Sequence, residues 1–142
     1  MKNNILNYLT LIIVICASIF FVTIYFNAAL PINIYTSVGL LLIIPSLVFF
    51  TIARIQLGSS FQVSAKANKL VTKGIYKKIR HPIYFFGLLF LLGIIIFLNQ
   101  FYFLIIWVGL IFLQIKRIKK EEIVLQEKFG EAYLKYKKNT WF

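Results

Sequence analysis

The sequence predicts an all-α integral membrane protein with about four transmembrane helices, a helical hairpin and a cytoplasmic C-terminal helix. Three observations support this prediction. Of the 142 residues, 61% are hydrophobic and only 14% are charged, whereas soluble domains usually carry about 25% charged residues. Two long stretches contain no charged residue at all. The basic residues that give the chain its net charge of +12 lie almost entirely in the segments after these stretches.

The first charge-free stretch, residues 3–53, is too long for a single bilayer crossing, which takes about 20 residues. Asparagine and proline interrupt it at residues 27–33. Proline disfavours a helix interior, and asparagine favours turns. We therefore predict a first span at residues 5–26 and a second at residues 34–53.

The second apolar stretch, residues 82–115, is interrupted near its middle by Asn99-Gln100. This pattern predicts a tight helical hairpin with spans at residues 83–98 and 101–115. Each half has about 16 residues, or about 24 Å at a rise of 1.5 Å per residue, slightly less than the hydrocarbon core of about 30 Å. A hairpin that enters the bilayer without fully crossing it is the alternative.

The charges predict how the chain is oriented. The loop at residues 54–82 has a net charge of +7, and the tail at residues 116–142 holds eight basic residues and all four acids. The turns at residues 27–33 and 99–100 carry no charge. Because basic segments favour the cytoplasmic side, we expect both termini and the loop there. We treat residues 1–142 as a single domain in a bacterial or archaeal cytoplasmic membrane, with the oligomeric state left open.

The composition also excludes several kinds of site. The chain has one histidine, one cysteine and no aspartate. A Ser-His-Asp triad is therefore excluded, and we expect no metal site. The basic residues are split between two juxtamembrane segments without a nucleic-acid-binding motif, so we expect membrane lipids, not nucleic acid, as partners.

Residues before the third span form an unusual helix start. Pro82 suits the first helical position, where its missing N–H costs nothing. His81 would then be the N-cap, where the helix dipole favours a neutral imidazole and attracts anionic groups. Arg80 adds a positive charge, Gly74 allows a turn with positive φ, and Tyr84 offers an aromatic face. An ordinary helix start with interfacial aromatic anchors is the alternative.

The tail combines an apolar face with carboxylates. At helical spacing one face holds Ile118, Glu122, Leu125, Phe129 and Tyr133. Burial of an unpaired carboxylate is costly, so the acid on this face should have a partner or a task. Arg117 and Glu121 lie four residues apart. The simple interpretation of that pair is a surface ion pair worth about 0.3–0.5 kcal/mol.

Taken together, the two segments resemble a known family. The first reads Gly74-x-Tyr76-x-x-x-Arg80-His81-Pro82-x-Tyr84. The second reads Arg117-x-x-x-Glu121-Glu122-x-x-Leu125-x-x-x-Phe129-Gly130-x-x-Tyr133-x-x-Tyr136. In this order, separated by a helical hairpin, they are similar to isoprenylcysteine carboxyl methyltransferases, part of a wider group that includes membrane phospholipid methyltransferases. The resemblance covers about residues 57–138.

The resemblance implies S-adenosylmethionine as methyl donor and a lipid-like or amphipathic acceptor, such as the carboxylate of an isoprenylcysteine-type molecule. It implies catalytic roles for Arg117, Glu121 and Glu122. Of these, Glu121 would hold the amino end of the cofactor, Arg117 would bind the acceptor carboxylate, and Glu122 would support the site together with Arg80. The cofactor pocket would be lined by Asn68, Lys69, Leu70, Val71, Tyr76, His81, Pro82, Ile83 and Tyr84.

Two other functions fit the same architecture. One is an NADPH-dependent membrane reductase of the steroid-reductase type, and the other is a non-enzymatic membrane scaffold. The Arg80-His81-Pro82 sequence and the adjacent Glu121-Glu122 pair favour the methyltransferase, and the sequence shows no extra basic cluster for a 2′-phosphate.

Overall fold

The computed structural model describes residues 33–58 and 70–141, together with Ile12, Ile19 and Thr23. The predicted first span, residues 5–26, therefore lies almost wholly outside the described residues. The same holds for residues 59–69, which include Asn68 and Lys69 of the predicted cofactor pocket.

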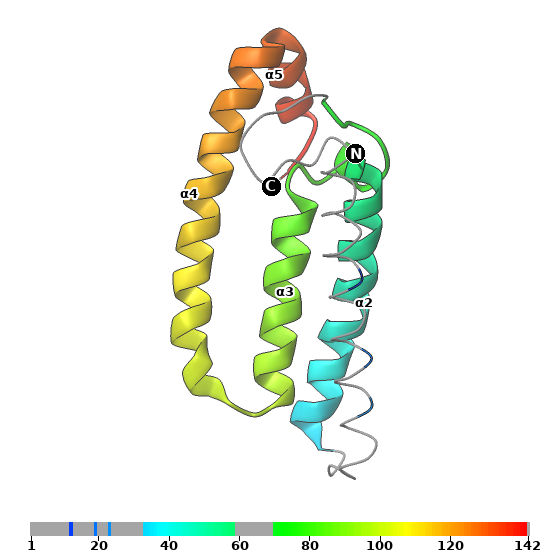
Figure 1. Ribbon diagram of the computed structural model, residues 1–142, viewed down its shortest axis with the longest axis vertical. Coiled ribbons are helices and arrows are strands. Elements are labelled where there is room, and N and C mark those ends of the chain that lie inside the picture. The colour runs from blue at the N-terminus through cyan, green and yellow to red at the C-terminus, as the bar shows by residue number, and fades with distance from the viewer. Residues whose placement is uncertain (1–11, 13–18, 20–22, 24–32, 59–69, 142) are drawn as a thin grey trace.

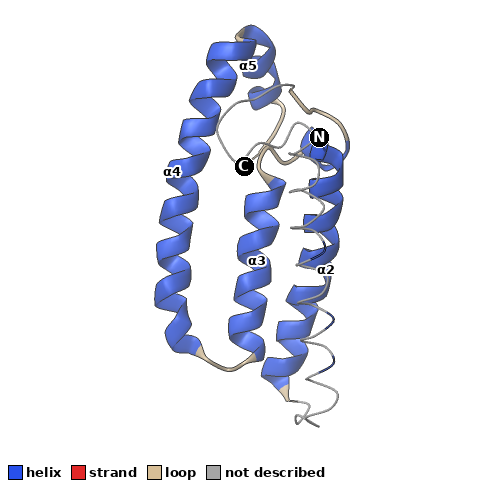
Figure 2. Cartoon of the chain, viewed as in Figure 1, coloured by secondary structure: helices blue, strands red, loops and turns tan. Residues whose placement is uncertain are grey.

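The described part of the chain is helical and contains no strand (Figure 2). Its elements are α2 (Ile34–Leu57), the short 3₁₀ helix η2 (Gly74–Lys77), α3 (Pro82–Phe97), the 3₁₀ helix η3 (Phe101–Phe103), α4 (Leu104–Phe129) and α5 (Glu131–Lys138). Helices α2, α3 and α4 extend along the long axis of the molecule, and α5 folds back beside the end of α4 (Figure 1). This order confirms the all-helical prediction and the helical hairpin.

Most predicted boundaries agree with the observed helices to within a few residues. Helix α2 starts at the predicted residue 34 but continues to Leu57, and α3 differs by one residue at each end. A capping interaction between two nearby residues explains why α2 starts at residue 34. Asn33 accepts a hydrogen bond from Thr36 N, and Thr36 Oγ1 accepts one from Asn33 N, each at 2.9 Å. This capping box satisfies backbone N–H groups that a helix start leaves unpaired.

The end of α4 differs from the prediction. We expected the fourth span to end at residue 115, but the same helix continues to Phe129. The residues beyond 115 are mainly Lys, Arg, Glu and Gln, which are good helix formers, so the change from apolar to charged sequence does not break the helix. It ends where Gly130 adopts a φ of 50°. Tyr133, which we expected on the same helical face, belongs to α5.

Two of the described helical segments are long and apolar enough to cross a membrane, Ile34–Leu57 and Phe101–Phe129, while Pro82–Phe97 is a shorter apolar helix. Helix α4 contains no fully buried residue. Many of its apolar side chains, such as Ile105 and Phe112, are exposed. Such a surface suits contact with lipid. The complete four-span topology stays a prediction.

Helices α2 and α3 pack closely because glycines allow their backbones to approach. A Cβ atom added to Gly39 of α2 would lie 2.5 Å from Phe97 Cβ and 2.6 Å from Phe97 Cα of α3. Farther along the pair, one added to Gly93 would lie 3.1 Å from Ile43 N. Small residues at helix contacts are typical of membrane proteins, in which van der Waals packing drives association.

Helix α4 is joined to α3 by a hairpin and by polar contacts. Gln100 N donates to Ile95 O at 3.1 Å within the hairpin, and Trp107 Nε1 donates to Leu88 O at 2.8 Å farther along the two helices. The hairpin and the start of α2 lie at one end of the molecule. The start of α3, the charged half of α4 and α5 lie at the other (Figure 1).

The close contact between α2 and α3 can be tested with Gly39→Ala. The new methyl group has to push against the Phe97 backbone, so we expect a loss of about 1–3 kcal/mol in unfolding free energy, the usual cost of overpacking. Thermal unfolding in detergent measures this loss. Gly109→Ala is the matched control, because an added Cβ there meets no atom within 4 Å from the rest of the described chain outside its own helix backbone. Equal unfolding temperatures for the two variants would contradict the packing argument.

The predicted topology can be tested by cysteine accessibility in a Cys16→Ala background. Single cysteines at Lys73 and Lys128, which lie in the basic segments, should react only with reagents that reach the cytoplasm. A cysteine at Asn99, in the uncharged hairpin, should react from the opposite side. Labelling of position 73 or 128 from outside intact cells would overturn this orientation.

Candidate functional site

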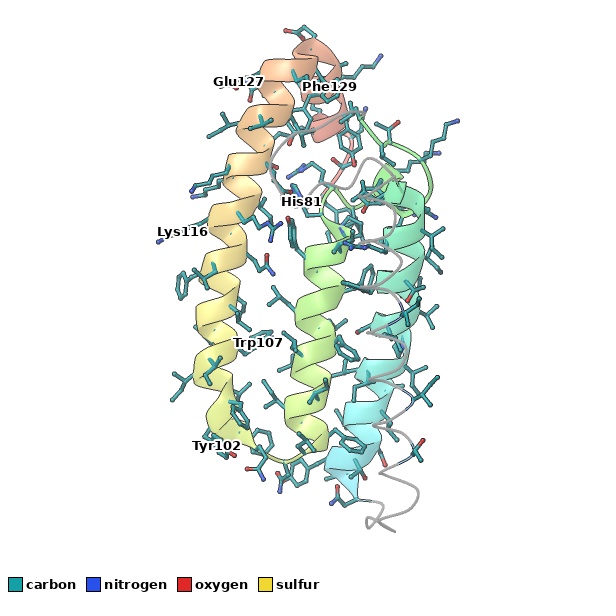
Figure 3. All side chains as sticks on the ribbon, in the orientation of Figure 1. His81, Tyr102, Trp107, Lys116, Glu127 and Phe129 are labelled. Carbon is teal, nitrogen blue, oxygen red and sulfur yellow. The ribbon has the colours of Figure 1, made fainter. Side chains whose placement is uncertain are left out.

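The two segments with unusual sequences meet at the charged end of the molecule. His81 lies at the start of α3 and faces the space between α3, α4 and α5 (Figure 3). It is the N-cap of α3, with φ −122° and ψ 55°, and Pro82 occupies the first turn, as the sequence predicts. Only 7% of the His81 surface is exposed. Gly74 has the positive φ that we expected, 62°.

Glu122 of α4 is surrounded by three basic groups from two other parts of the chain, the segment before α3 and α5. Its Oε1 lies 3.2 Å from Arg80 Nε and 3.6 Å from His81 Nε2, and its Oε2 accepts a hydrogen bond from Lys137 Nζ at 2.7 Å. Burial alone would raise the pKa of this carboxyl, but Lys137, Arg80 and His81 outweigh it and hold the pKa below its ordinary value. The expectation that this carboxylate has partners is confirmed.

Glu121, the neighbouring carboxylate, has a different set of partners. Its Oε1 accepts a hydrogen bond from the Tyr84 hydroxyl and lies 3.4 Å from Arg117 Nε, while Oε2 lies 4.0 Å from His81 Nδ1. The Arg117 guanidinium also sits over the Tyr84 ring, with Cζ 5.5 Å from the ring centroid. The predicted adjacency of Arg117 and Glu121 is confirmed. Tyr84 adds a contact to each of them from α3.

The surroundings of His81 favour its neutral form. Burial lowers the pKa of its imidazole by removing water from the charged form. Glu121 and Glu122 oppose this shift, and Arg80 adds to it. The distance of 3.6 Å from Nε2 to Glu122 Oε1 is too long for a hydrogen bond. The imidazole is therefore buried, and its Nε2 atom makes no hydrogen bond.

Buried polar atoms without a hydrogen bond gather in this cluster. Within the described residues four such side-chain atoms occur, and three of them are Arg80 Nε, His81 Nε2 and Tyr133 Oη; the fourth is Ser46 Oγ in α2. Native structures rarely leave such groups unpaired. Arg80 Nε is ion-paired with Glu122, so His81 Nε2 and Tyr133 Oη are the two atoms here to which a polar ligand or water would bind.

The remaining predicted cofactor residues differ in placement. Tyr76 is buried, but its hydroxyl donates to Ala53 O of α2 at 3.3 Å and its carbonyl accepts from Tyr136 at 2.7 Å, so it braces neighbouring elements. Leu70, Val71 and Ile83 are half-buried and Pro82 is buried. The described residues contain no group of three His, Cys, Asp or Glu side chains placed to hold a metal ion.

Sequence reasoning missed the contribution of α5 and the residues after it. Lys137 pairs with Glu122, and the Arg80 Nη1 atom donates to Lys137 O and Thr140 O, each at 3.0 Å. No local pattern reveals these contacts, since residue 137 lies 15 positions beyond Glu122 and 57 beyond Arg80. The signal that was available is Gly130, whose positive φ ends α4 and turns α5 back onto the site.

Comparison with known proteins identifies the family. Residues 34–132 match the phospholipid methyltransferase family, which is most of the chain. One relative is protein-S-isoprenylcysteine O-methyltransferase of the yeast Schizosaccharomyces pombe, 38% identical over 98 residues; this alignment covers 62% of the chain and 40% of the relative. The chain thus spans less than half the length of that relative. Both matches favour the methyltransferase interpretation over the reductase. The matched region includes α2, α3 and α4, the whole first motif and the second motif as far as Gly130, and the chain belongs to the phospholipid methyltransferase family.

Proposed function

We propose that this chain is an S-adenosylmethionine-dependent membrane methyltransferase that acts on a lipid-like or amphipathic acceptor, with the carboxylate of an isoprenylcysteine-type molecule as the preferred target. The observation that carries the proposal is the single cluster formed by Arg80, His81, Arg117, Glu121 and Glu122 at the end of apolar helices. The name of the yeast relative supports transfer to oxygen.

The cluster has the chemistry to hold S-adenosylmethionine. The amino-acid end of this molecule carries an ammonium and a carboxylate. Glu121, 25% exposed at its side chain, would accept hydrogen bonds from the ammonium, while Tyr133 Oη and His81 Nε2 are buried atoms that make no hydrogen bond. Other residues proposed to line the pocket are Asn68, Lys69, Leu70, Val71, Tyr76, Pro82, Ile83 and Tyr84. When bound, the cofactor supplies an electrophilic methyl group on a sulfonium.

Arg117 would bind the acceptor. Its side chain is 43% exposed, about as much as that of Lys137 and more than that of any other charged group in the cluster, and the Tyr84 ring supports its guanidinium. A guanidinium binds a carboxylate through two parallel hydrogen bonds, which orients as well as attracts it. Methyl transfer then forms one C–O bond and breaks one C–S bond, with the electron pair left on sulfur. No proton has to be removed from a carboxylate, so no side chain is needed as a general base.

The surroundings of the cluster favour such a reaction. A carboxylate that accepts a methyl group from a sulfonium loses its charge in the transition state, so removal of water and in-line alignment help more than added charges. The apolar part of α4, from Leu104, leads directly into the segment that carries Arg117 and Glu121. We propose that a lipid acceptor approaches from the bilayer and that the soluble donor enters from the cytoplasm.

Cofactor binding tests the donor. Calorimetry on detergent-purified protein should detect S-adenosylmethionine and S-adenosylhomocysteine, and not NADPH. Glu121→Gln should weaken binding by roughly ten- to a hundredfold, because a charged hydrogen bond contributes about 1.5–3 kcal/mol, and His81→Ala should also weaken it. Glu127→Gln, at an exposed position of the same helix, is the control. Unchanged affinity in both site variants, or selective NADPH binding, would sink the assignment.

The separate roles of Arg117 and Glu121 can be tested kinetically. Arg117→Ala should raise the acceptor KM or lower kcat and leave cofactor affinity nearly intact, because the guanidinium is assigned to the acceptor. Reversal of the pair, Arg117→Glu with Glu121→Arg, should restore an ion pair without restoring activity. Lys120→Ala, an exposed change on the same helix, controls for lost surface charge. A reversed protein that methylates normally would show that the two residues form only a structural pair.

A further inference from the structure

We propose that residues 136–141, the C-terminal strap, are a positioning element of the site: they fix the backbone before His81 and the guanidinium of Arg80. The effect of the strap on catalysis rests on the proposed function. The geometry alone defines the strap, which comprises the last turn of α5 and the residues that follow it. It lies against the segment between η2 and α3 (Figure 1).

Arg80 is the point at which the strap and the carboxylate cluster meet. Its Nη1 donates to Lys137 O and Thr140 O, each at 3.0 Å, and lies 3.4 Å from Thr140 Oγ1. On the other side of the same guanidinium, Nε lies 3.2 Å from Glu122 Oε1. A planar guanidinium offers donors in fixed directions, so its orientation toward Glu122 depends on the two strap carbonyls.

The strap also binds the backbone that leads into His81. Trp141 N donates to Lys78 O at 3.0 Å, and residues Ile79 and Trp141 form an isolated parallel β-bridge. The Trp141 ring lies edge-on to Phe85 of α3, with ring centroids 6.3 Å apart, yet 58% of this tryptophan is exposed. Its main structural contribution to the site is therefore the backbone contact and not the burial of its ring.

A third attachment lies at the start of the strap. The Tyr136 hydroxyl donates to Tyr76 O at 2.7 Å, and Thr140 Oγ1 donates to Tyr136 O at 2.9 Å. Helix α5 has only eight residues, far fewer than the roughly 12–15 at which an isolated helix becomes marginally stable in water. These contacts therefore hold α5 in place, and α5 in turn presents Lys137 to Glu122.

The position of His81 depends on this arrangement. Its side chain makes no capping hydrogen bond to α3, so its placement depends on the backbone of residues 78–80 and on the groups that face it. Those groups include Glu121 and Glu122 from α4, the Tyr84 ring from α3 and Arg80 from its own segment. In group transfer, a displacement of about 1 Å can lower the rate by about a hundredfold.

Paired variants of Trp141 separate the backbone contact from the ring. Trp141→Pro removes the N–H that binds Lys78 O, and Trp141→Ala keeps it and removes only the ring. We expect kcat to fall by about tenfold or more in Trp141→Pro and far less in Trp141→Ala, with acceptor KM nearly constant. Lys138→Ala, an exposed change in the strap itself, should leave activity unchanged.

A combination with Arg80 tests whether the strap acts through that residue. Arg80→Lys keeps the positive charge but loses the guanidinium, whose separate N–H donors contact the strap carbonyls and Glu122 at the same time. If the strap works through Arg80, Trp141→Pro should cost little more in the Arg80→Lys background, because residues that act as one unit are not additive. Effects that simply multiply would overturn the part of the proposal in which the strap acts through Arg80. If Trp141→Pro loses its helical circular dichroism, Tyr136→Phe decides instead, since it removes one hydrogen bond without touching the backbone.

The single histidine of the chain provides a readout that does not need turnover. In ¹⁵N-labelled protein the imidazole signals belong to His81 alone. Trp141→Pro and Tyr136→Phe should move its pKa toward the ordinary value as water enters, and Trp141→Ala should not. An unchanged His81 titration in both strap variants would refute the positioning role. If the strap variants shift the His81 titration but the wild-type protein does not bind S-adenosylmethionine, the proposed function is refuted and the positioning role of the strap stands.

Discussion

The pairing of the Glu122 carboxylate is the constraint on which the rest of the site depends. A half-buried carboxylate is tolerated only with close positive partners, and loss of one partner is costly because the charge that remains is uncompensated. The partners here are Arg80, from the segment before α3, and Lys137, from α5. The same ion cluster that neutralises one side chain therefore fixes three segments that are distant in sequence, and it brings His81 to within 4.0 Å of both carboxylates.

The two adjacent carboxylates therefore differ in how readily they can exchange their present partners for a ligand. Glu122 belongs to a closed network with Arg80 and Lys137, and its pKa is held low by them. One oxygen of Glu121, Oε1, contacts both Tyr84 and the more exposed Arg117. An ion pair at such an exposed position contributes little to stability, so it can be exchanged for ligand contacts at small cost. This difference in environment is the physical basis for our proposal that the Arg117–Glu121 pair meets the ligands while Glu122 maintains the site.

The helices support the site in unequal ways. Close contact at Gly39 and Gly93 makes α2 and α3 a compact pair. Helix α4 has no fully buried residue in its described length, and its contacts to α3 include the Trp107 hydrogen bond and the Tyr84–Glu121 hydrogen bond. His81 and Pro82 stand at the start of α3, so the close packing of α2 and α3 supports their position. The apolar surface of α4 suits lipid along the route toward the charged cluster.

The sequence by itself determined the helical fold, the hairpin and the two motif segments, because hydropathy, charge and the signals of Pro82 and Asn99 act over a few residues. Local rules also placed His81 at the N-cap and Arg117 beside Glu121. They did not show that the predicted fourth span and the helix after it are continuous, since good helix formers carry α4 past residue 115 to Phe129. Only the tertiary structure decided which residues meet Glu122. Lys137 reaches Glu122, and the carbonyls of residues 137 and 140 reach Arg80, because Gly130 reverses the chain. Contacts across 15 to 60 residues leave no periodicity that a single sequence could reveal.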